Sequence, residues 1–278
     1  MSRARDVADG ALGTIAGANG QVLTSDGNNW SSQAVPTELP AHGTSGNVLT
    51  STGSAWASQA AAGGGLASAQ MFTSSGTWTK PTGIKLIRVR GVGGGGGACQ
   101  PTGNSAYYQG LGGGSGGYFE FLLDVSSIAS FSITIGAGGA GASSTTGVDG
   151  GNTVITGYVT AEGGHRGYSN ESEVETTAAV TFTSAITSAA EYYYSIAGQK
   201  GTEGGTGSSA TGTDAVGEGG SNPLGFGGNG VNRGSQRKGA DGVGYGSGGS
   251  AKSGGTYYGS ELMGGSGKDG VVIVEEFK

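Results

Sequence analysis

The sequence predicts an all-β protein in which a short shaft of β-hairpin repeats precedes a small β-sandwich with a glycine-rich lattice. Glycine supplies 64 of the 278 residues, and each interior glycine weakens a helix by roughly 0.5–1 kcal/mol relative to alanine. No 11-residue stretch shows an apolar period of 3.6, whereas several shorter stretches alternate as strands do. The low apolar content also fits a disordered chain, but disorder normally accompanies a larger net charge than −6.

The N-terminal part of the chain contains an internal repeat. Residues 20–33 recur as residues 46–59 with nine of 14 positions identical, and Asp26-Gly27 is a strong hairpin-turn signal. The first copy has only three large apolar residues, Val22, Leu23 and Trp30. A lone hairpin is marginally stable in water. We therefore expect residues 1–65 to form a shaft that associates with other copies of the chain.

Beyond the hinge-like Gly63-Gly64-Gly65, the pattern changes to strands. The C-terminal domain is predicted to span residues 66–278, with a β-base formed by 70–97, 117–160 and 271–277. Lys80-Pro81-Thr82-Gly83 is expected to be a turn. The strands expected in the base are Ile84–Arg90, Tyr118–Val125, Phe131–Ile135, Thr153–Thr160 and Val271–Phe277.

The remaining residues, 98–116 and 161–270, are predicted to form a glycine-rich lattice and its loops. Chains made mostly of glycine can pack so closely in a polyproline-II-like conformation that neighbours satisfy each other's backbone hydrogen bonds. An inward Cβ would push such chains apart, so we expect glycine to be required at the closest contacts. The positions chosen for this role are Gly93, Gly94, Gly95, Gly96, Gly97, Gly138 and Gly139.

Several parts of the chain resemble parts of a known type of glycine-rich domain. Residues 72–81, followed by the strand 84–89 and the run 91–97, resemble the opening of the glycine-rich domain of phage tail-fibre adhesins, and residues 267–274 resemble its closing strand. The resemblance implies a receptor-binding tip with a polyglycine-II-type lattice and loops that recognise a bacterial surface protein or polysaccharide. It also implies a homotrimer on the virion, made in the host cytoplasm and joined through its N-terminus to other tail proteins. The glycine-poor stretch 168–199 departs from this pattern and is expected to be an inserted strand or hairpin.

Four motifs imitate enzyme or metal sites. The GxGxxG match at 91–96 lacks the helix that a dinucleotide site needs, and the GxSxG match at 113–117 sits in a glycine run. Gly264–Val271 fits one copy of a calcium-binding repeat, but an Asp-Gly turn is the preferred interpretation there. The acidic residues Glu171, Glu173 and Glu175 could serve glycoside hydrolysis, although a solvated loop is favoured. We therefore expect no catalytic residue, metal or cofactor.

Tyrosine is the most informative candidate for recognition. Nine of the 11 tyrosines lie outside the predicted strands, in segments rich in Gly, Ser and Asn. This composition is typical of recognition loops, although some of the rings could instead cap the edges of the lattice. The candidate receptor-binding residues are Tyr107, Tyr108, Tyr168, Tyr192, Tyr193, Tyr194, Tyr245, Tyr257 and Tyr258.

The favoured hypothesis is a non-enzymatic adhesin. The alternatives are a structural fibre that decorates a capsid or tail, a surface-polysaccharide depolymerase and a glycine-rich cellular matrix protein. The acidic balance argues against nucleic-acid binding, and no apolar run is long enough to predict a membrane span.

Overall fold

The computed structural model divides the chain into two compact units, Met1–Gly63 and Gly64–Lys278, which we describe in turn. The structure describes residues 21–25, 30–34, 47–51, 56–60, 65–99, 110–144, 146–168, 177–202, 217–230, 238–251 and 263–278.

The N-terminal unit contains the two predicted hairpins. Strand β1 (Gln21–Ser25) pairs antiparallel with β2 (Trp30–Ala34), and β3 (Asn47–Ser51) pairs in the same way with β4 (Trp56–Ala60). The register is the same in both copies, because the first strand ends opposite the tryptophan that begins the second. The sequence repeat is therefore also a structural repeat.

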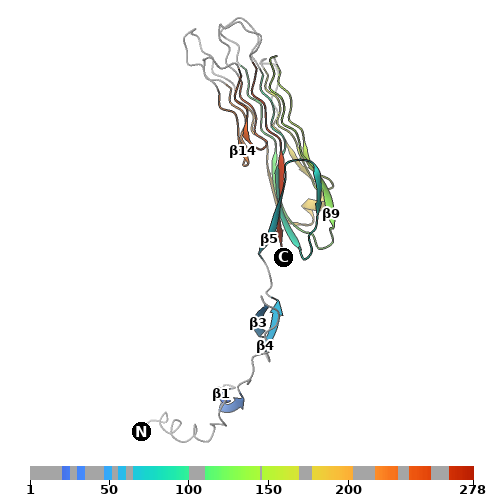
Figure 1. The fold of residues 1–278 in the computed structure, drawn as a ribbon, viewed down its shortest axis with the longest axis vertical. Helices are drawn as coiled ribbons and strands as arrows, with labels where there is room; N and C mark the ends of the chain where they lie inside the picture. Colours follow the sequence, from blue (N-terminus) through green and yellow to red (C-terminus); the bar gives the residue numbers. More distant parts are fainter. Residues whose placement is uncertain are drawn as a thin grey trace, which may run out of the picture. The chain divides into compact units, whose positions relative to one another are not determined.

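The C-terminal unit contains a β-sandwich whose two sheets have five strands each (Figure 1). The first, which we call the tyrosine sheet, has the order β13-β8-β7-β16-β5, and all its neighbours are antiparallel. The strand β16 lies between β5 and β7, so the two ends of this unit's sequence meet in one sheet. Its strands are β5 (Leu66–Phe72), β7 (Leu86–Val92), β8 (Tyr118–Asp124), β13 (Ala190–Ile196) and β16 (Val271–Phe277).

The second sheet, which we call the threonine sheet, has the order β12-β11-β10-β9-β6. The predicted single strand Thr153–Thr160 is wrong, because the chain reverses there at Gly157, whose φ is +86°. Only glycine adopts such a backbone conformation readily, and the result is a hairpin instead of one strand. The strands are β6 (Gly76–Thr79), β9 (Ser130–Thr134), β10 (Thr153–Ile155), β11 (Val159–Ala161) and β12 (Val180–Phe182).

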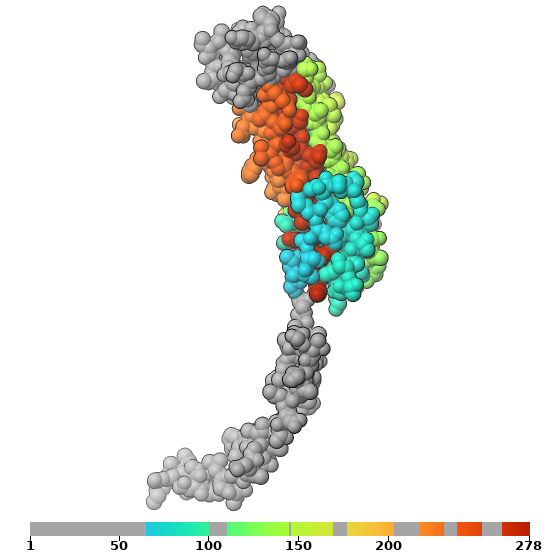
Figure 2. All heavy atoms as spheres, viewed as in Figure 1, coloured from blue at the N-terminus to red at the C-terminus, as the bar shows by residue number. Residues whose placement is uncertain are grey.

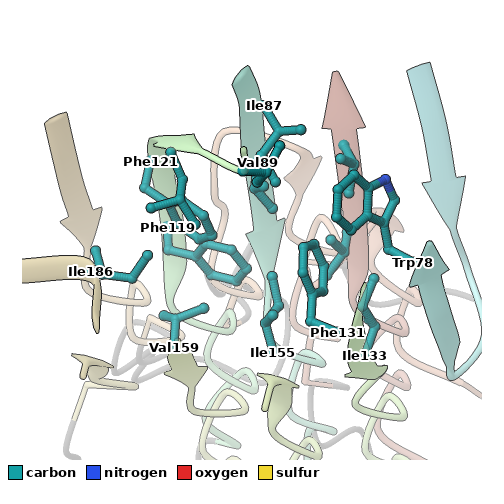
Figure 3. Close-up of a cluster of buried hydrophobic side chains, with 14 of the residues drawn as sticks. Trp78, Ile87, Val89, Phe119, Phe121, Phe131, Ile133, Ile155, Val159 and Ile186 are labelled. Atoms are coloured by element: carbon teal, nitrogen blue, oxygen red, sulfur yellow. The ribbon is translucent and has the colours of Figure 1, made fainter. Parts of the chain in front are cut away.

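The apolar core lies between the two sheets (Figure 3). Alternation along β7, β8 and β9 sends every second side chain into it, except where Val92 and Tyr118 are buried in a separate small cluster. Trp78 stacks on Phe131 with ring centroids 4.6 Å apart, and both residues are buried. The buried carboxyl group of Glu276 accepts hydrogen bonds from Ser68, from Gln70 at 2.7 Å and from the Trp78 indole at 2.7 Å, so donors from both sheets satisfy its oxygens.

Residues 180–196 complete the sandwich, and this corrects the predicted boundary between base and lattice. The stretch, which we placed outside the base and expected to be an inserted strand or hairpin, forms β12, a short helix α3 (Ser184–Thr187) and β13. The strands β12 and β13 are edge strands of the two sheets. Ile186 of α3 is buried in the sandwich core. The low glycine content of this stretch indicated an added strand. The strands with which β12 and β13 pair lie too far away in the sequence for a local pattern to identify them.

Beyond the sandwich, glycine-rich segments run side by side without forming sheets or helices (Figure 1). We call this part the glycine-rich body. In Figure 2 the orange residues of 217–251 and the green residues of 110–168 pack closely, with the red C-terminal segment between them. Its described segments are 93–99, 110–117, 135–144, 146–152, 162–168, 197–202, 217–222, 227–230, 238–242, 247–251 and 264–270.

Residues 93–98 show how the glycine-rich body is held together. Successive N–H groups of this segment donate to three neighbouring segments in turn. When the same neighbouring segment accepts again, the accepting residue lies three positions earlier in the sequence. A three-residue period is what a polyproline-II-type helix has; the assignment of these segments to polyglycine-II helices stays a prediction. The donor–acceptor pairs, with N···O distances of 2.8–3.0 Å, are Gly93–Gly117, Gly94–Gly151, Gly95–Lys268, Gly96–Gly114, Gly97–Val148 and Ala98–Gly265.

Side chains are excluded from the spaces between these segments. A Cβ added at any of the seven glycines selected from the sequence would lie closer than 3.0 Å to a backbone carbonyl of a neighbouring segment, a separation that real Cβ atoms essentially never show. At Gly94 the obstructing carbonyl belongs to Ala137, and at Gly138 it belongs to Gly267. The close approach of backbones therefore explains the glycine content of these segments.

Candidate binding surfaces

One end of the glycine-rich body gathers the ends of many segments. Hydrogen bonds join Leu111 N to Tyr168 O at 3.0 Å, Thr202 N to Glu218 O at 2.9 Å and Ala251 N to Gly217 O at 2.8 Å. A bridge pairs Lys238 with Met263, and Ala98 bonds to Gly265. These residues flank the stretches 100–109, 169–176, 203–216, 231–237 and 252–262, which lie outside the described residues. We call the described residues at this end the distal end.

Four of the nine predicted tyrosines, Tyr107, Tyr108, Tyr257 and Tyr258, lie in those stretches and therefore outside the described residues. The same holds for Glu171, Glu173 and Glu175.

Two further predicted tyrosines lie in described parts of the chain. Tyr168 is at the distal end, where the guanidinium carbon of Arg166 lies 5.2 Å from its ring centroid and Arg166 also reaches Asp149 at 3.8 Å. Such a cation–π contact fixes the ring. Tyr245 instead packs against the small buried cluster of Val92, Tyr118 and Val271 at the junction with the sandwich. Its role is therefore structural, which was the alternative to recognition for some of the tyrosines.

The predicted loop position of Tyr192, Tyr193 and Tyr194 is wrong, because all three lie in the edge strand β13. Because side chains alternate along a strand, the three tyrosines lie on both faces of the sheet. Tyr193 lies opposite Phe121 on the core side, and its ring centroid is 5.1 Å from the ring centroid of Phe182. Tyr192 and Tyr194 point to the outer face of the sheet.

A carboxylate organises that outer face. The Tyr192 hydroxyl donates to Glu120 Oε1 at 2.7 Å, and the hydroxyls of Tyr118 and Tyr194 donate to Oε2 at 2.9 and 3.1 Å. Burial alone would raise the pKa of the Glu120 carboxyl, but the three hydroxyl donors outweigh it and the pKa lies below its usual value. Burial and the bond to Glu120 together raise the pKa of Tyr192 to about 12.

Next to this cluster, two arginines share one glutamate. Arg88 on β7 is ion-paired with Glu275 on the neighbouring β16, and Arg90 reaches the other oxygen of the same carboxylate at 3.2 Å. The hydrogen bond from Arg88 holds the pKa of Glu275 below its usual value against the opposing effect of burial. These two arginines are therefore paired within the chain.

The Asp-Gly motifs do not form the positive-φ turns that we predicted. The described glycines with positive φ are Gly83, Gly157, Gly244 and Gly246, and none belongs to these motifs. Each aspartate instead accepts a backbone N–H from a neighbouring segment of the glycine-rich body. The pairs are Asp149 with Arg166 N at 2.8 Å, Asp241 with Ser266 N at 2.8 Å and Asp269 with Gly138 N at 2.7 Å.

The motifs that imitate catalytic sites are also built into the body. Ser115 of the GxSxG match is buried, and its hydroxyl donates to Ser221 O while accepting from Gln199 N, both at 2.9 Å. Cys99 is buried as well, and burial raises its pKa to about 11. Within the described ranges, no group of three or more His, Cys, Asp and Glu side chains could hold a metal ion.

Sequence reasoning missed Glu120, Arg88 and Glu275 as members of a surface. The signal was present in the alternation of their strands, where each occupies a position that points away from the core. What the sequence did not reveal is that β13 pairs with β8, which brings the tyrosines of one to the glutamate of the other.

The architecture defines an all-β protein whose sandwich carries a body of closely packed glycine-rich segments. The chain belongs to the glycine-rich domain family, whose model matches residues 71–276. No curated protein matches the sequence. None of the described helices has the length and apolar character needed to cross a membrane.

Proposed function

We propose that this protein is a non-enzymatic phage tail-fibre adhesin that recognises a bacterial surface receptor at the distal end of its glycine-rich body. In this proposal the N-terminal repeats assemble the chain as a homotrimer and connect it to other tail proteins of the virion. The segments of the body are polyglycine-II-type helices. The chain is made in the host cytoplasm and functions on the virion.

The observation that carries the proposal is the convergence of segment ends. Residues flanking five stretches lie together at the distal end, so five separate pieces of sequence begin or end there. Two of those pieces contain the tyrosine pairs 107–108 and 257–258. Recognition surfaces are commonly built from loops held by a rigid scaffold, and tyrosine supplies contact area at low entropic cost.

The body is suited to act as that scaffold. Its segments are cross-connected by backbone hydrogen bonds in several directions, and its glycines leave no space for side-chain rearrangement. Variation in the five stretches would therefore leave the packing of the body unchanged. Several copies of the chain would add avidity to a modest single-site affinity.

The test is adsorption of a phage that encodes this chain to the strain on which it forms plaques. We expect adsorption to be lost in Tyr257→Ala/Tyr258→Ala or in Tyr107→Ala/Tyr108→Ala, while virions still carry the protein. Thr77→Ala/Thr79→Ala, on the outer face of the threonine sheet, is the matched control and should adsorb like the parent.

Two results would overturn the proposal. If virions lacking the whole chain adsorb normally, the protein is a decorating fibre. If both tyrosine variants adsorb normally while Tyr192→Ala/Tyr194→Ala does not, recognition lies on the tyrosine sheet and not at the distal end.

A further inference from the structure

The two sheets of the sandwich have very different outer faces. On the threonine sheet, seven of the eight outward positions carry a hydroxyl side chain, and the alternation of the strands identifies all eight. The hydroxyl groups of these side chains hydrogen-bond to water, and Val154 is the only outward aliphatic side chain among the described strands of this sheet. The outward residues are Thr77, Thr79, Ser130, Ser132, Thr134, Val154, Thr160 and Thr181.

The outer face of the tyrosine sheet is aromatic, aliphatic and charged. Met71 is 52% exposed, and Tyr194 and Ile196 are each 44% exposed. Tyrosine, methionine and arginine are enriched in protein interfaces, whereas serine is depleted. The strand registers place on this face Met71, Arg88, Arg90, Glu120, Leu122, Tyr192, Tyr194, Ile196, Ile273 and Glu275.

The central charges of this face are bound within the chain, although the buried Nε of Arg90 has no hydrogen-bond partner. Arg88 and Arg90 pair with Glu275, and Glu120 accepts from three tyrosines. With the exposed Asp124 at the end of β8, the face carries two positive and three negative side chains, so it offers no attraction to an anionic polymer. A partner that covered the centre of the face would gain apolar burial while the Arg–Glu pairs stay intact, and breaking such pairs is the costly outcome in an interface.

Apolar surface continues beyond the sheet. The short strands β14 (Gly225–Phe226) and β15 (Val243–Gly244) pair with each other, and their neighbours Leu224 and Tyr245 cover the end of the same outer face at Val92, Tyr118 and Val271. Phe226 is 76% exposed and Val243, directly opposite it, is 64% exposed. These are the two most exposed large apolar side chains in the described part of the chain.

We propose that the outer face of the tyrosine sheet packs against a second copy of this chain. The occupant follows from the connection between the two units. Strand β5, which carries Met71, begins two residues after the boundary at Gly64. Once the N-terminal units associate, as the proposed function requires, the C-terminal units are tethered at the edge of this face, and a short tether creates an effective concentration in the millimolar range.

The outer face of the tyrosine sheet supplies most of the area that such an interface needs. Five strands about 4.8 Å apart, each rising about 3.3 Å per residue over roughly seven residues, span an area on the order of 550 Å². Stable interfaces bury about 800 Å² per partner, and β14 and β15 add to the available area. Identical faces of this kind can meet around a cyclic axis.

Site-specific cross-linking of the full chain tests the proposal. Ile196→Cys places a thiol on the tyrosine face, and Thr181→Cys places one on the edge strand of the threonine sheet as the matched control. The native Cys99 is buried and does not compete. With a short bismaleimide, we expect covalent dimers from Ile196→Cys, in a yield independent of protein concentration, and at least tenfold less from Thr181→Cys.

Methionine oxidation gives a second readout on the unmodified protein. In a single chain Met71 is more exposed than Met263, at 52% against 40%. If a second copy covers the tyrosine face, Met71 should oxidise several-fold more slowly than Met263 when sulfoxides are measured by mass spectrometry. Oxidation of Met71 at the rate of Met263 or faster, together with equal cross-linking of the two cysteine variants, would overturn the proposal.

Light scattering on the same samples separates this proposal from the function on which it rests. A multimer without Met71 protection would refute only the packing of the tyrosine face. A monomer would refute both this packing and the proposed assembly through the N-terminal repeats. Protection of Met71 that appears only when cells are added would assign the face to a receptor and reject the second copy.

Discussion

In the β-sandwich, apolar side chains fill the space between two sheets, whereas in the glycine-rich body the backbone of one segment fills the space beside the next. Trp78, Phe119 and Phe121 are among the largest buried side chains of the sandwich. In the body, residues 93–98 are surrounded by other backbones and make their hydrogen bonds to several segments. One region therefore depends on what its side chains fill, and the other depends on the absence of side chains.

This difference determines which substitutions each region tolerates. In the sandwich, removing atoms opens a cavity, and the cost depends on how far the surroundings relax. In the body, adding atoms separates segments and breaks several backbone hydrogen bonds together, each worth about 1 kcal/mol net. Four predictions follow the comparison from the largest effect to the smallest.

The largest effect is expected from Gly94→Val or Gly138→Val. The new side chain would meet the carbonyl of Ala137 or of Gly267, which cannot move without displacing a whole segment. We expect destabilisation above about 4 kcal/mol, measured by thermal unfolding and by protease sensitivity. The control is Ala137→Val, at an exposed position next to Gly138, which should stay within about 0.5 kcal/mol of the parent. Unchanged melting temperatures in both glycine variants would contradict close packing of the segments.

The second effect concerns the sandwich. Phe119→Ala removes a fully buried ring from the core, and such truncations cost about 3–5 kcal/mol. Chemical denaturation with tryptophan fluorescence would measure it, since Trp78 belongs to the same core. Ser132→Ala on the outer face of the threonine sheet serves as the control. A loss below about 1 kcal/mol would mean that the core contributes far less to stability than its packing indicates.

How well each region could be predicted from the sequence follows from the same difference. The strand Val271–Phe277 was predicted with its observed bounds, because its alternation and its flanking glycine are local signals. Both hairpin repeats were predicted for the same reason. The need for glycine in the body could be inferred from composition, because only the absence of Cβ atoms explains such runs.

The errors arose wherever the outcome depended on contacts between distant residues. The edge strand β13 pairs with β8, more than 60 residues away in the sequence, so the low glycine content around Tyr192 indicated a strand or hairpin but not the sheet that it would join. The aspartates of the Asp-Gly motifs resembled turn residues, but their partners are N–H groups of other segments. The division of Thr153–Thr160 into two strands depended on a single glycine at position 157.

The third prediction tests those aspartates. Asp269→Ala removes the acceptor for the N–H of Gly138 at the edge of the body, and we expect a loss of about 1 kcal/mol, read as a lower melting temperature. Asp269→Asn keeps an acceptor oxygen and should recover most of the loss. Calcium should not raise the melting temperature of the parent protein. A calcium-dependent increase that disappears in Asp269→Ala would restore the metal interpretation.

The smallest effect is expected from the charged groups of the tyrosine sheet. The pKa values of Glu120 and Glu275 lie below those of an unfolded chain, so each carboxylate binds its proton less readily when folded. The stability that they contribute is therefore present above the usual carboxyl pKa and is lost as the pH falls through the folded-state values. Both groups are partly exposed, so solvent screening keeps the contribution small.

Tyr192→Phe/Tyr194→Phe isolates the hydroxyl contribution. Two of the three donors to Glu120 are removed while both rings remain. The pKa of Glu120 should then rise toward or above its usual value, because the opposing effect of burial persists. NMR titration of the Glu120 carboxyl carbon would measure this. An unchanged Glu120 pKa would show that the three-tyrosine cluster does not persist in solution. The tyrosine face would then lack the fixed rings on which its packing against a second copy depends.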